Sequence, residues 1–392
     1  MTANNKNIDK QGKKLLNVPN LRFPEFEGEW EKKTIGEATE EFQSGRYLKA
    51  DKIKAEGKNP VYGGNGLRGY TESYNHIGDY VLIGRQGALC GNIRFVTGKT
   101  YITEHAIAVK GNKDNDTKFL QYLFEGMNLG HYSDQSAQPG LAVSKLLRLC
   151  IYTPKKQEQN QIAKFLTLID ERIATQNRII NKLQSLMKGL NDYLQDSVPL
   201  SYSLSFSDIG EDYSGLSGKS AEDFGSGKPY ITYVSIYANN FVEDDCCGKV
   251  SVKRDEKQNV VQKGDMLFTL SSETPEEVCY GAVYSGNSTE TYLNSFCFGV
   301  RNTEGKVFSP YMAYFFNSNR FRREVYPLAQ GSTRFNLQKS DFLQKHFSYP
   351  SIDDQHRIFE ILNAYDNKLK VENQILVHYQ HQKEFLLRNL FI

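Results

Sequence analysis

A segment that occurs twice constrains the fold of this chain more than any other feature of its sequence. The two copies, residues 154–194 and 350–390, align without a gap at an offset of 196 positions. The first five identities pair Pro154, Gln159, Ile162, Leu166 and Asp170 with Pro350, Gln355, Ile358, Leu362 and Asp366, and five more follow up to Leu194 and Leu390. An internal repeat of this kind predicts two equivalent structural elements within one chain.

Both copies have the pattern of a long helix. In the first copy, apolar residues recur in steps of four and three from Ile162 to Leu194, which is the spacing of a coiled-coil interface. The second copy repeats this spacing, and a polar residue interrupts the two interfaces at equivalent places, Gln176 and Glu372. A single helix of this kind would more often pack on a core. Two copies with the same interruption favour an antiparallel coiled coil, because a whole domain lies between them.

The repeat divides the rest of the chain into two domains. We expect an α+β fold in which two mixed α/β domains are separated by two long helices that form an antiparallel coiled coil. The predicted parts are a flexible N-terminal tail (1–20), a first domain (21–153), a first helical region (154–196), a second domain (197–349) and a second helical region (350–392). The two domains share an outline, because GDYVLIG (78–84) resembles GDMLFTL (264–270), each a turn followed by a buried strand.

Composition excludes several classes of protein. Lys and Arg number 48 against 46 Asp and Glu, so the net charge gives no indication for or against nucleic acid. No stretch reaches the roughly 18 apolar residues of a membrane span, and the first 20 residues lack the apolar core of a signal peptide. The six cysteines form no CxxC pair, so we expect free thiols, no metal site and a cytoplasmic location.

Basic residues gather locally although the whole chain is balanced. Residues 46–110 contain ten Lys or Arg against five acids, and residues 301–345 contain eight against three. Both stretches are interleaved with Tyr, Asn, Gln, Ser and Thr. Basic side chains suit phosphates, and Arg, amides and hydroxyls suit base edges. Taken alone, either stretch is equally consistent with DNA binding and with an ordinary solvated surface.

Flexible turns and the segments that follow buried strands supply the candidate contacts to double-stranded DNA. In the first domain these are Arg46, Tyr47, Lys49, Asn65, Arg68, Tyr70, Arg85 and Gln86. In the second domain they are Ser271, Ser272, Ser332, Thr333, Arg334 and Asn336.

Two segments resemble catalytic or cofactor-binding motifs but lack features that those motifs require. Gly64, Gly66 and Gly69 spell GxGxxG, but YTESYNH after them does not have a helical pattern, as a dinucleotide-binding turn requires. Residues 59–62, NPVY, differ from the NPPY motif of amino-methyltransferases, and no phosphate-binding loop or HExxH is present. We therefore expect no catalysis and no cofactor. The alternatives are a stand-alone DNA methyltransferase or endonuclease, and a coiled-coil scaffold whose domains bind proteins rather than DNA.

The order of domain, long helix, domain and related helix, with the opening LRFPEFEGEWEKKTIGE (21–37), resembles the specificity subunit (HsdS) family of type I restriction–modification systems. The most specific elements are the two helix starts with the pattern P-x-x-x-x-Q-x-x-I-x-x-x-L-x-x-x-D, at residues 154–170 and 350–366. The resemblance covers nearly the whole chain from Leu21.

The resemblance implies that each domain is a target-recognition domain for one half of a split DNA site. It implies that the helices set the unread gap and bind two modification subunits, which supply S-adenosylmethionine and adenine methylation, and that restriction subunits add ATP-driven translocation and cleavage. The implied partner-binding positions are Ile162, Leu166, Ile169, Asp170, Ile358, Leu362, Tyr365 and Asp366. Differences between the copies, such as Phe359 for Ala163, imply that the two helices meet their partners unequally.

Overall fold

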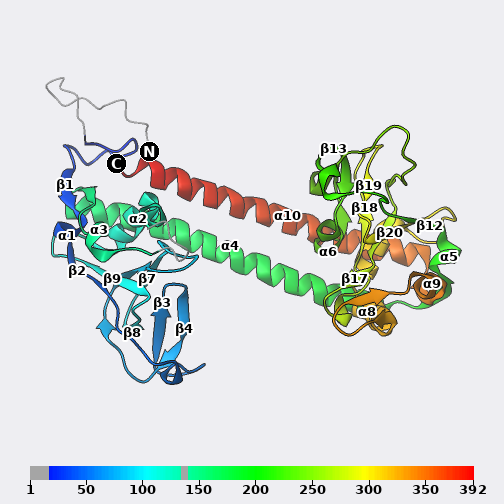
Figure 1. The fold of residues 1–392 in the computed structure, drawn as a ribbon, viewed down its shortest axis with the longest axis horizontal. Coiled ribbons are helices and arrows are strands. Elements are labelled where there is room, and N and C mark those ends of the chain that lie inside the picture. The colour runs from blue at the N-terminus through cyan, green and yellow to red at the C-terminus, as the bar shows by residue number, and fades with distance from the viewer. Residues whose placement is uncertain (1–16, 134–139) are drawn as a thin grey trace. The chain divides into compact units, whose positions relative to one another are not determined.

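The chain folds into two compact units, each of which contains strands, short helices and part of both long helices (Figure 1). Unit 1 comprises Met1–Asn177 and Gln374–Ile392, and unit 2 comprises Arg178–Asn373. The computed structural model describes residues 17–133 and 140–392, so most of the predicted N-terminal tail (1–20) lies outside the described residues. The predicted α+β class is confirmed. None of the helices in these ranges is long and apolar enough to span a bilayer.

Unit 1 is built on two four-stranded sheets. One has the order β2-β9-β6-β7 with antiparallel neighbours, and the other has the order β4-β3-β8-β5, in which β3 and β8 run parallel. Its strands are β1 (Glu31–Thr34), β2 (Thr39–Ser44), β3 (Asn59–Gly63), β4 (Gly66–Thr71), β5 (His76–Ile77), β6 (Tyr80–Gly84), β7 (Ile93–Val96), β8 (Lys99–Ile102), β9 (Ala106–Gly111) and β10 (Cys150–Thr153). Its helices are α1 (Ile35–Ala38), η1 (Ala50–Lys52), α2 (Thr117–Met127), η2 (Leu129–Tyr132) and α3 (Val143–Leu146), and α4 (Lys156–Ser197) begins here.

Strand β6 is buried on both faces, which explains its unbroken apolar sequence. Alternate residues of a strand point to opposite faces. Val81 and Ile83 therefore join the core formed with α2 and the long helices, whereas Tyr80 and Leu82 pack in a separate cluster with Ile102 of the second sheet.

Unit 2 repeats this plan with additions. Its sheets have the orders β12-β20-β16-β18-β14, β15-β13-β19, β17-β22-β21 and β11-β23. Its strands are β11 (Leu200–Ser205), β12 (Glu211–Ser214), β13 (Phe224–Ile231), β14 (Phe241–Val242), β15 (Cys247–Val250), β16 (Met266–Thr269), β17 (Ser271–Ser272), β18 (Gly281–Tyr284), β19 (Tyr292–Leu293), β20 (Cys297–Arg301), β21 (Ala329–Gln330), β22 (Phe335–Leu337) and β23 (His346–Pro350). Its helices are α5 (Phe206–Ile209), η3 (Ala221–Asp223), α6 (Tyr233–Ala238), η4 (Asp244–Cys246), η5 (Pro275–Glu277), α7 (Ser309–Phe315), α8 (Asn319–Val325), η6 (Tyr326–Leu328) and α9 (Lys339–Gln344), and α10 (Ile352–Asn389) begins here.

The two units have equivalent elements in the same order, as the shared outline predicts. Strand β1 pairs with β10 as β11 pairs with β23, and the middle strand of one sheet, β3 or β13, has one antiparallel and one parallel neighbour in each unit. The short helices α1 and α5 both begin with a capping box, made by Thr34 and Glu37 in one unit and by Ser205 and Asp208 in the other.

The repeated glutamine fastens each long helix to its unit. Gln159 Nε2 donates to Pro154 O (2.8 Å), and its Oε1 accepts from Asp116 N (2.8 Å) just before α2. Gln355 Nε2 likewise donates to Pro350 O (3.0 Å), and its Oε1 accepts from Phe308 N (2.8 Å) just before α7. A side-chain amide is needed because it offers a donor and an acceptor together, and both side chains are buried.

Within each unit the two long helices run antiparallel and contribute to the same apolar core. In unit 1 the start of α4 shares a core with Leu386 and Leu390 near the end of α10. In unit 2, Leu190 and Leu194 near the end of α4 pack against the core that contains the start of α10. The predicted interface is not continuous, because Tyr365 is exposed and the neighbouring Asp366 is half-buried instead. A straight helix has about 3.6 residues per turn rather than 3.5, so the inward face drifts along the sequence.

Candidate nucleic-acid interface

The turn between β3 and β4 lies against two other loops of unit 1. A Cβ atom on Gly64 would lie 2.7 Å from His105 O and 3.5 Å from Gln86 O, so only glycine permits this close approach. Gly64 and Gly66 belong to a hairpin, since β4 follows the turn where a dinucleotide-binding motif would need a helix.

The segment after β6 joins this turn through His105. Arg85 N donates to His105 O (2.9 Å), and Gln86 Oε1 lies 3.1 Å from His105 Nδ1. Arg94 on β7 completes the group, because a Cβ on Gly66 would lie 2.9 Å from Arg94 Nη2. We call Asn65, Arg68, Arg85, Gln86, Arg94 and His105 the unit 1 basic cluster.

The basic cluster is solvent-accessible and its arginines lack acidic partners. Asn65, Arg68, Gln86, Arg94 and His105 are exposed, and Arg85 is half-buried. In the described ranges no carboxylate lies within 4 Å of the three guanidinium groups, whereas His105 Nε2 lies 3.3 Å from Glu104. Arg94 and His105 are not among the DNA contacts predicted from the sequence. The alternation of exposed Arg94 with half-buried neighbours on β7 could have indicated an outward-facing arginine.

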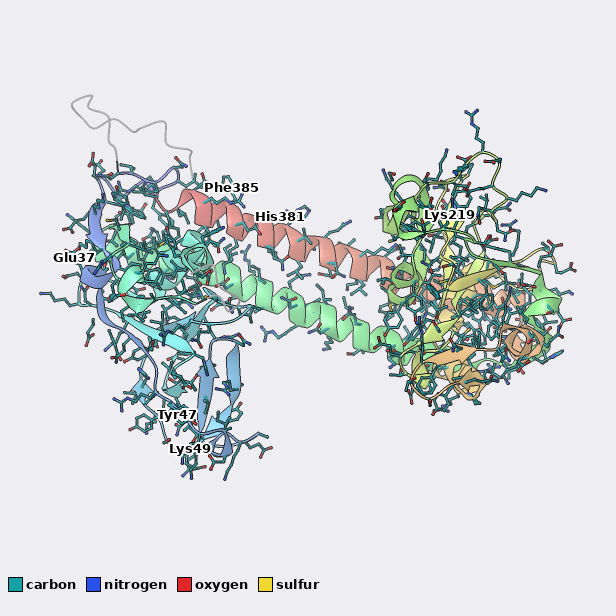
Figure 2. All side chains as sticks on the ribbon, viewed as in Figure 1. Glu37, Tyr47, Lys49, Lys219, His381 and Phe385 are labelled. Atoms are coloured by element: carbon teal, nitrogen blue, oxygen red, sulfur yellow. The ribbon has the colours of Figure 1, made fainter. Side chains whose placement is uncertain are left out.

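Arg46, Tyr47 and Lys49 lie on the loop between β2 and η1, and their side chains are exposed. Figure 2 labels Tyr47 and Lys49 on this loop. Arg46 N donates to Ile102 O (2.9 Å), and Tyr101 Oη donates to Tyr47 O (3.1 Å). The segment 101–105 therefore contacts this loop at one end and the basic cluster at the other. Tyr70 is half-buried and lies further along β4, where its backbone pairs with that of Lys54 (N···O 2.8 and 2.9 Å).

The candidates in unit 2 divide into buried and exposed residues. Ser271 and Ser272 were predicted from the sequence as DNA contacts. They are buried in β17, which pairs with β22, and are therefore not on the surface. Ser332, Thr333, Arg334 and Asn336 are exposed. The guanidinium of Arg334 donates to Ser271 Oγ (3.2 Å) and lies 5.6 Å from the ring centroid of Phe296. Phe296 is an exposed aromatic residue that is not among the contacts predicted from the sequence.

Several basic residues of 301–345 hold the fold together. Arg322 donates to the carbonyl oxygens of Glu276, Val278 and Cys279 (2.6–2.8 Å), and burial lowers its pKa. Arg301 forms two hydrogen bonds with Asp265 (2.8 and 3.0 Å), which raise its pKa. This stretch therefore does not form the continuous basic surface that its composition allows.

Most of the apolar positions expected to bind a partner belong to the chain's own cores. Ile162, Leu166 and Ile169 are buried in unit 1, and Ile358 and Leu362 are buried in unit 2. They cannot present their side chains to another protein while these cores are intact, which corrects that expectation. The long helices expose a different set of large apolar side chains: Leu168, Ile179, Leu186, Tyr193, Ile352, Ile361, Tyr365, Val371, Val377 and Phe385.

The described residues contain no group of three or more His, Cys, Asp or Glu that could hold a metal ion. Burial raises the pKa of the Cys247 thiol to about 11 and that of Cys297 to about 12, so these thiols are poor nucleophiles at neutral pH.

Known proteins resemble this chain in sequence. The type I restriction modification DNA specificity domain family matches residues 27–185 and 207–378. The type I restriction enzyme EcoprrI specificity subunit of Escherichia coli is 40% identical over 154 residues, which span only 38% of this chain and 38% of that protein. A putative type I restriction enzyme specificity subunit of Haemophilus influenzae is 21% identical over 381 residues, 92% of this chain and 95% of that one.

Solved structures share the fold. The S subunit of a type I restriction-modification system from M. genitalium superposes with a TM-score of 0.61 at 18% identity, covering 96% of this chain and 99% of that one. A second structure, from work on complex assembly and conformational transition of the type I R-M system, superposes with a TM-score of 0.56 at 13% identity. The match covers 91% of this chain and 96% of that one. Because the family match covers both domains and much of both long helices, the chain belongs to the family of type I restriction–modification specificity subunits.

Proposed function

We propose that this chain reads a bipartite double-stranded DNA site on behalf of catalytic partner subunits. Each unit would read one half-site, and the chain itself would contribute neither catalysis nor a cofactor. Modification subunits, two in number, would methylate adenine with S-adenosylmethionine, and restriction subunits would add ATP-driven translocation and cleavage. We expect this assembly in the cytoplasm.

The observation that carries this proposal is the unit 1 basic cluster. Three arginines for which the described residues offer no acidic partner, together with an asparagine, a glutamine and a histidine, converge on one accessible surface from the β3–β4 hairpin, β7 and the segments that follow β6 and precede β9. Arginine paired with guanine and amides paired with adenine are the commonest direct contacts in the major groove, and arginine also binds phosphates. The loop that carries Arg46, Tyr47 and Lys49 would extend the same interface.

In unit 2 we propose a smaller interface at the loop 331–336. Arg334 is held between Ser271 and Phe296, while Ser332, Thr333 and Asn336 offer hydroxyl and amide groups beside it. Ser271 and Ser272 would position this loop through the pairing of β17 with β22 rather than contact a base. Because the loops of the two units differ in sequence, each unit would read a different half-site.

For the partners, we propose that the exposed apolar residues of α4 and α10 form the contact surface for the modification subunits. Burying such side chains between helices is the ordinary source of affinity in an interface. The polar or charged neighbours on the same helices, including Asp366, would contribute specificity.

Methyl-transfer and binding experiments test the proposal. The chain together with its modification subunit should incorporate labelled methyl groups into DNA that carries a split site, and the chain alone should incorporate none. Replacing residues 21–153 with the matching domain of a relative should change one half-site and leave the other intact. Methyl transfer by the isolated chain would refute the non-catalytic role. Duplex binding by the assembled complex that does not weaken with rising salt would instead favour a protein-binding scaffold.

A further inference from the structure

An ion-pair site in unit 1 provides the reference for this inference. Lys383 Nζ of α10 lies 2.7 Å from an oxygen of Asp170 on α4 and 2.8 Å from an oxygen of Glu125 at the end of α2. Tyr122 Oη donates a hydrogen bond to the other oxygen of Asp170 (2.8 Å). The carboxylate on α4 is thus neutralised by a lysine that the chain itself supplies.

The corresponding site of unit 2 has the aspartate but has no lysine at the position equivalent to Lys383. At the offset of the repeat, Asp366 corresponds to Asp170 and Met187 corresponds to Lys383. The equivalence of α2 with α7 places Tyr314 at the position of Tyr122 and Asn317 at that of Glu125. Across residues 17–133 and 140–392, no hydrogen-bond or ion-pair partner is found for the Asp366 carboxylate, and the buried Tyr314 hydroxyl also has none.

A cavity of about 560 Å³ adjoins Asp366. Apolar surface from Met187, Phe241 and Leu369 lines part of it, and amide side chains line much of the rest. The Asn317 side-chain nitrogen donates to Asn240 Oδ1 (2.9 Å) and Ala313 O (3.1 Å), and no described residue donates to the side-chain oxygen of Asn317, which can therefore accept.

The charged groups around this cavity do not neutralise Asp366. Lys370 Nζ lies 2.6 Å from a carboxylate oxygen of Glu243, so its charge is already paired. Lys188 borders the cavity from α4, but its side chain is exposed to solvent. Burial raises the pKa of Asp366, Lys370 opposes the rise and Glu243 adds to it.

We propose that this cavity of unit 2 receives a lysine side chain from a partner polypeptide, with its ammonium group on Asp366. The methylene stem would lie along Met187, Phe241 and Leu369, and the carbonyl oxygen of Asn317 would accept from the same ammonium. A partner lysine thereby takes the part that Lys383 plays in unit 1. The inference rests on the proposed function in one respect, since the partner is the modification subunit bound to the long helices.

Zero-length carbodiimide cross-linking of the assembled complex tests this directly, because the reagent joins a carboxylate to an amine that touches it. Peptide mass spectrometry should find Asp366 joined to a lysine of the modification subunit. The Asp170–Lys383 link within the chain is the internal control. Finding that control while Asp366 is unlinked, or is linked only to Lys188 or Lys370, would overturn the proposal.

Two variants sharpen the test. Met187→Lys should supply the missing lysine, so the link from Asp366 to the partner should give way to a link within the chain, whereas Met187→Leu should leave the partner link in place. Asp366→Asn should weaken binding of the modification subunit by about tenfold or more, because a partly desolvated ammonium loses its counter-charge. Asp353→Asn makes the same charge change at an exposed position of the same helix and is the matched control. Unchanged affinity in Asp366→Asn would contradict the inference.

Failure of the proposed function has a different signature. If the modification subunit does not bind the chain at all, size-exclusion chromatography shows no complex for the wild type or any variant. If it binds and Asp366 plays no part, the complex forms normally and every variant matches the wild type.

Discussion

Lys383→Met should destabilise unit 1 by about 2 kcal/mol. The lysine side chain is 21% exposed, and its partners Glu125 and Asp170 are 18% and 32% exposed. Breaking a fully buried pair costs about 3–5 kcal/mol and an exposed pair about 0–1 kcal/mol, so a site of intermediate burial falls between these limits. Methionine retains most of the apolar stem, which confines the loss to the charge. The variant also makes unit 1 resemble unit 2 at this position.

Fluorescence of Trp30 can follow this change in unit 1 alone. Trp30 is the only tryptophan of the chain, is buried in the unit 1 core and lies 6.5 Å from the ring of Phe391, just beyond α10. With a urea dependence of about 1–3 kcal/mol per molar, the midpoint of its unfolding transition should fall by about 1 M. Restoring neutrality with Glu125→Gln and Asp170→Asn in the same chain should recover much of the loss.

The pH dependence gives a second readout of the same site. Burial alone would lower the pKa of Lys383, but Glu125 and Asp170 outweigh it and raise the pKa above its ordinary value of 10.5. The stabilisation is therefore complete below pH 10.5 and is lost as pH rises through the elevated pKa. The difference between wild type and Lys383→Met should accordingly shrink in strong alkali. A variant with an unchanged midpoint at pH 7 would show that the ion pair contributes nothing to stability.

Four further outcomes are expected. Arg85→Ala and Arg94→Ala should each cost about 1–3 kcal/mol of DNA binding and relax one position of one half-site; a uniform loss with a smaller salt slope would make that residue a phosphate contact. Gln355→Ala should lower the stability of unit 2 by about 2 kcal/mol and speed hydrogen exchange at the Phe308 amide, whereas Gln380→Ala, at an exposed site, should change neither. Arg322→Ala should destabilise unit 2 without altering the salt dependence of DNA binding, since all its hydrogen bonds are internal. One extra heptad in each long helix should widen the unread gap between the half-sites by about three base pairs, because seven residues add about 10 Å and DNA rises about 3.4 Å per base pair. Sequencing of methylated sites measures this gap. If the lengthened protein keeps the original gap, the helices are not the spacer.

The helices and buried strands could be predicted because their signals are periodic and local. The four-and-three spacing gives α4 and α10, and the apolar run of residues 80–84 gives β6. The exposed position of Tyr365 could not be read from spacing, because small departures from an ideal heptad accumulate along a straight helix.

The candidate site was predicted less completely because it depends on distant segments. The parallel pairing of β3 with β8 brings the loop at Gly64 to His105, 41 positions away in sequence. Such a pairing leaves no local signal. Composition also could not show that Arg322 binds carbonyl oxygens while Arg94 remains accessible, since both are arginines in equally basic stretches.

The differences between the two copies of the repeat determine which residues contribute to folding and which can contribute to the affinity for a partner. Residues whose side chains form hydrogen bonds within the chain in both units, such as Gln159 and Gln355, stabilise the fold and have no hydrogen-bonding group left for a partner. Asp366 differs, because it is half-buried and the only described cation that lowers its pKa is Lys370, which already forms an ion pair with Glu243. A carboxylate that loses part of its hydration in this way costs free energy. A cation that reaches it gains back that cost in addition to the direct attraction. An ion pair at Asp366 should therefore contribute more to affinity than one at an exposed position such as Asp353, which is worth about 0–1 kcal/mol.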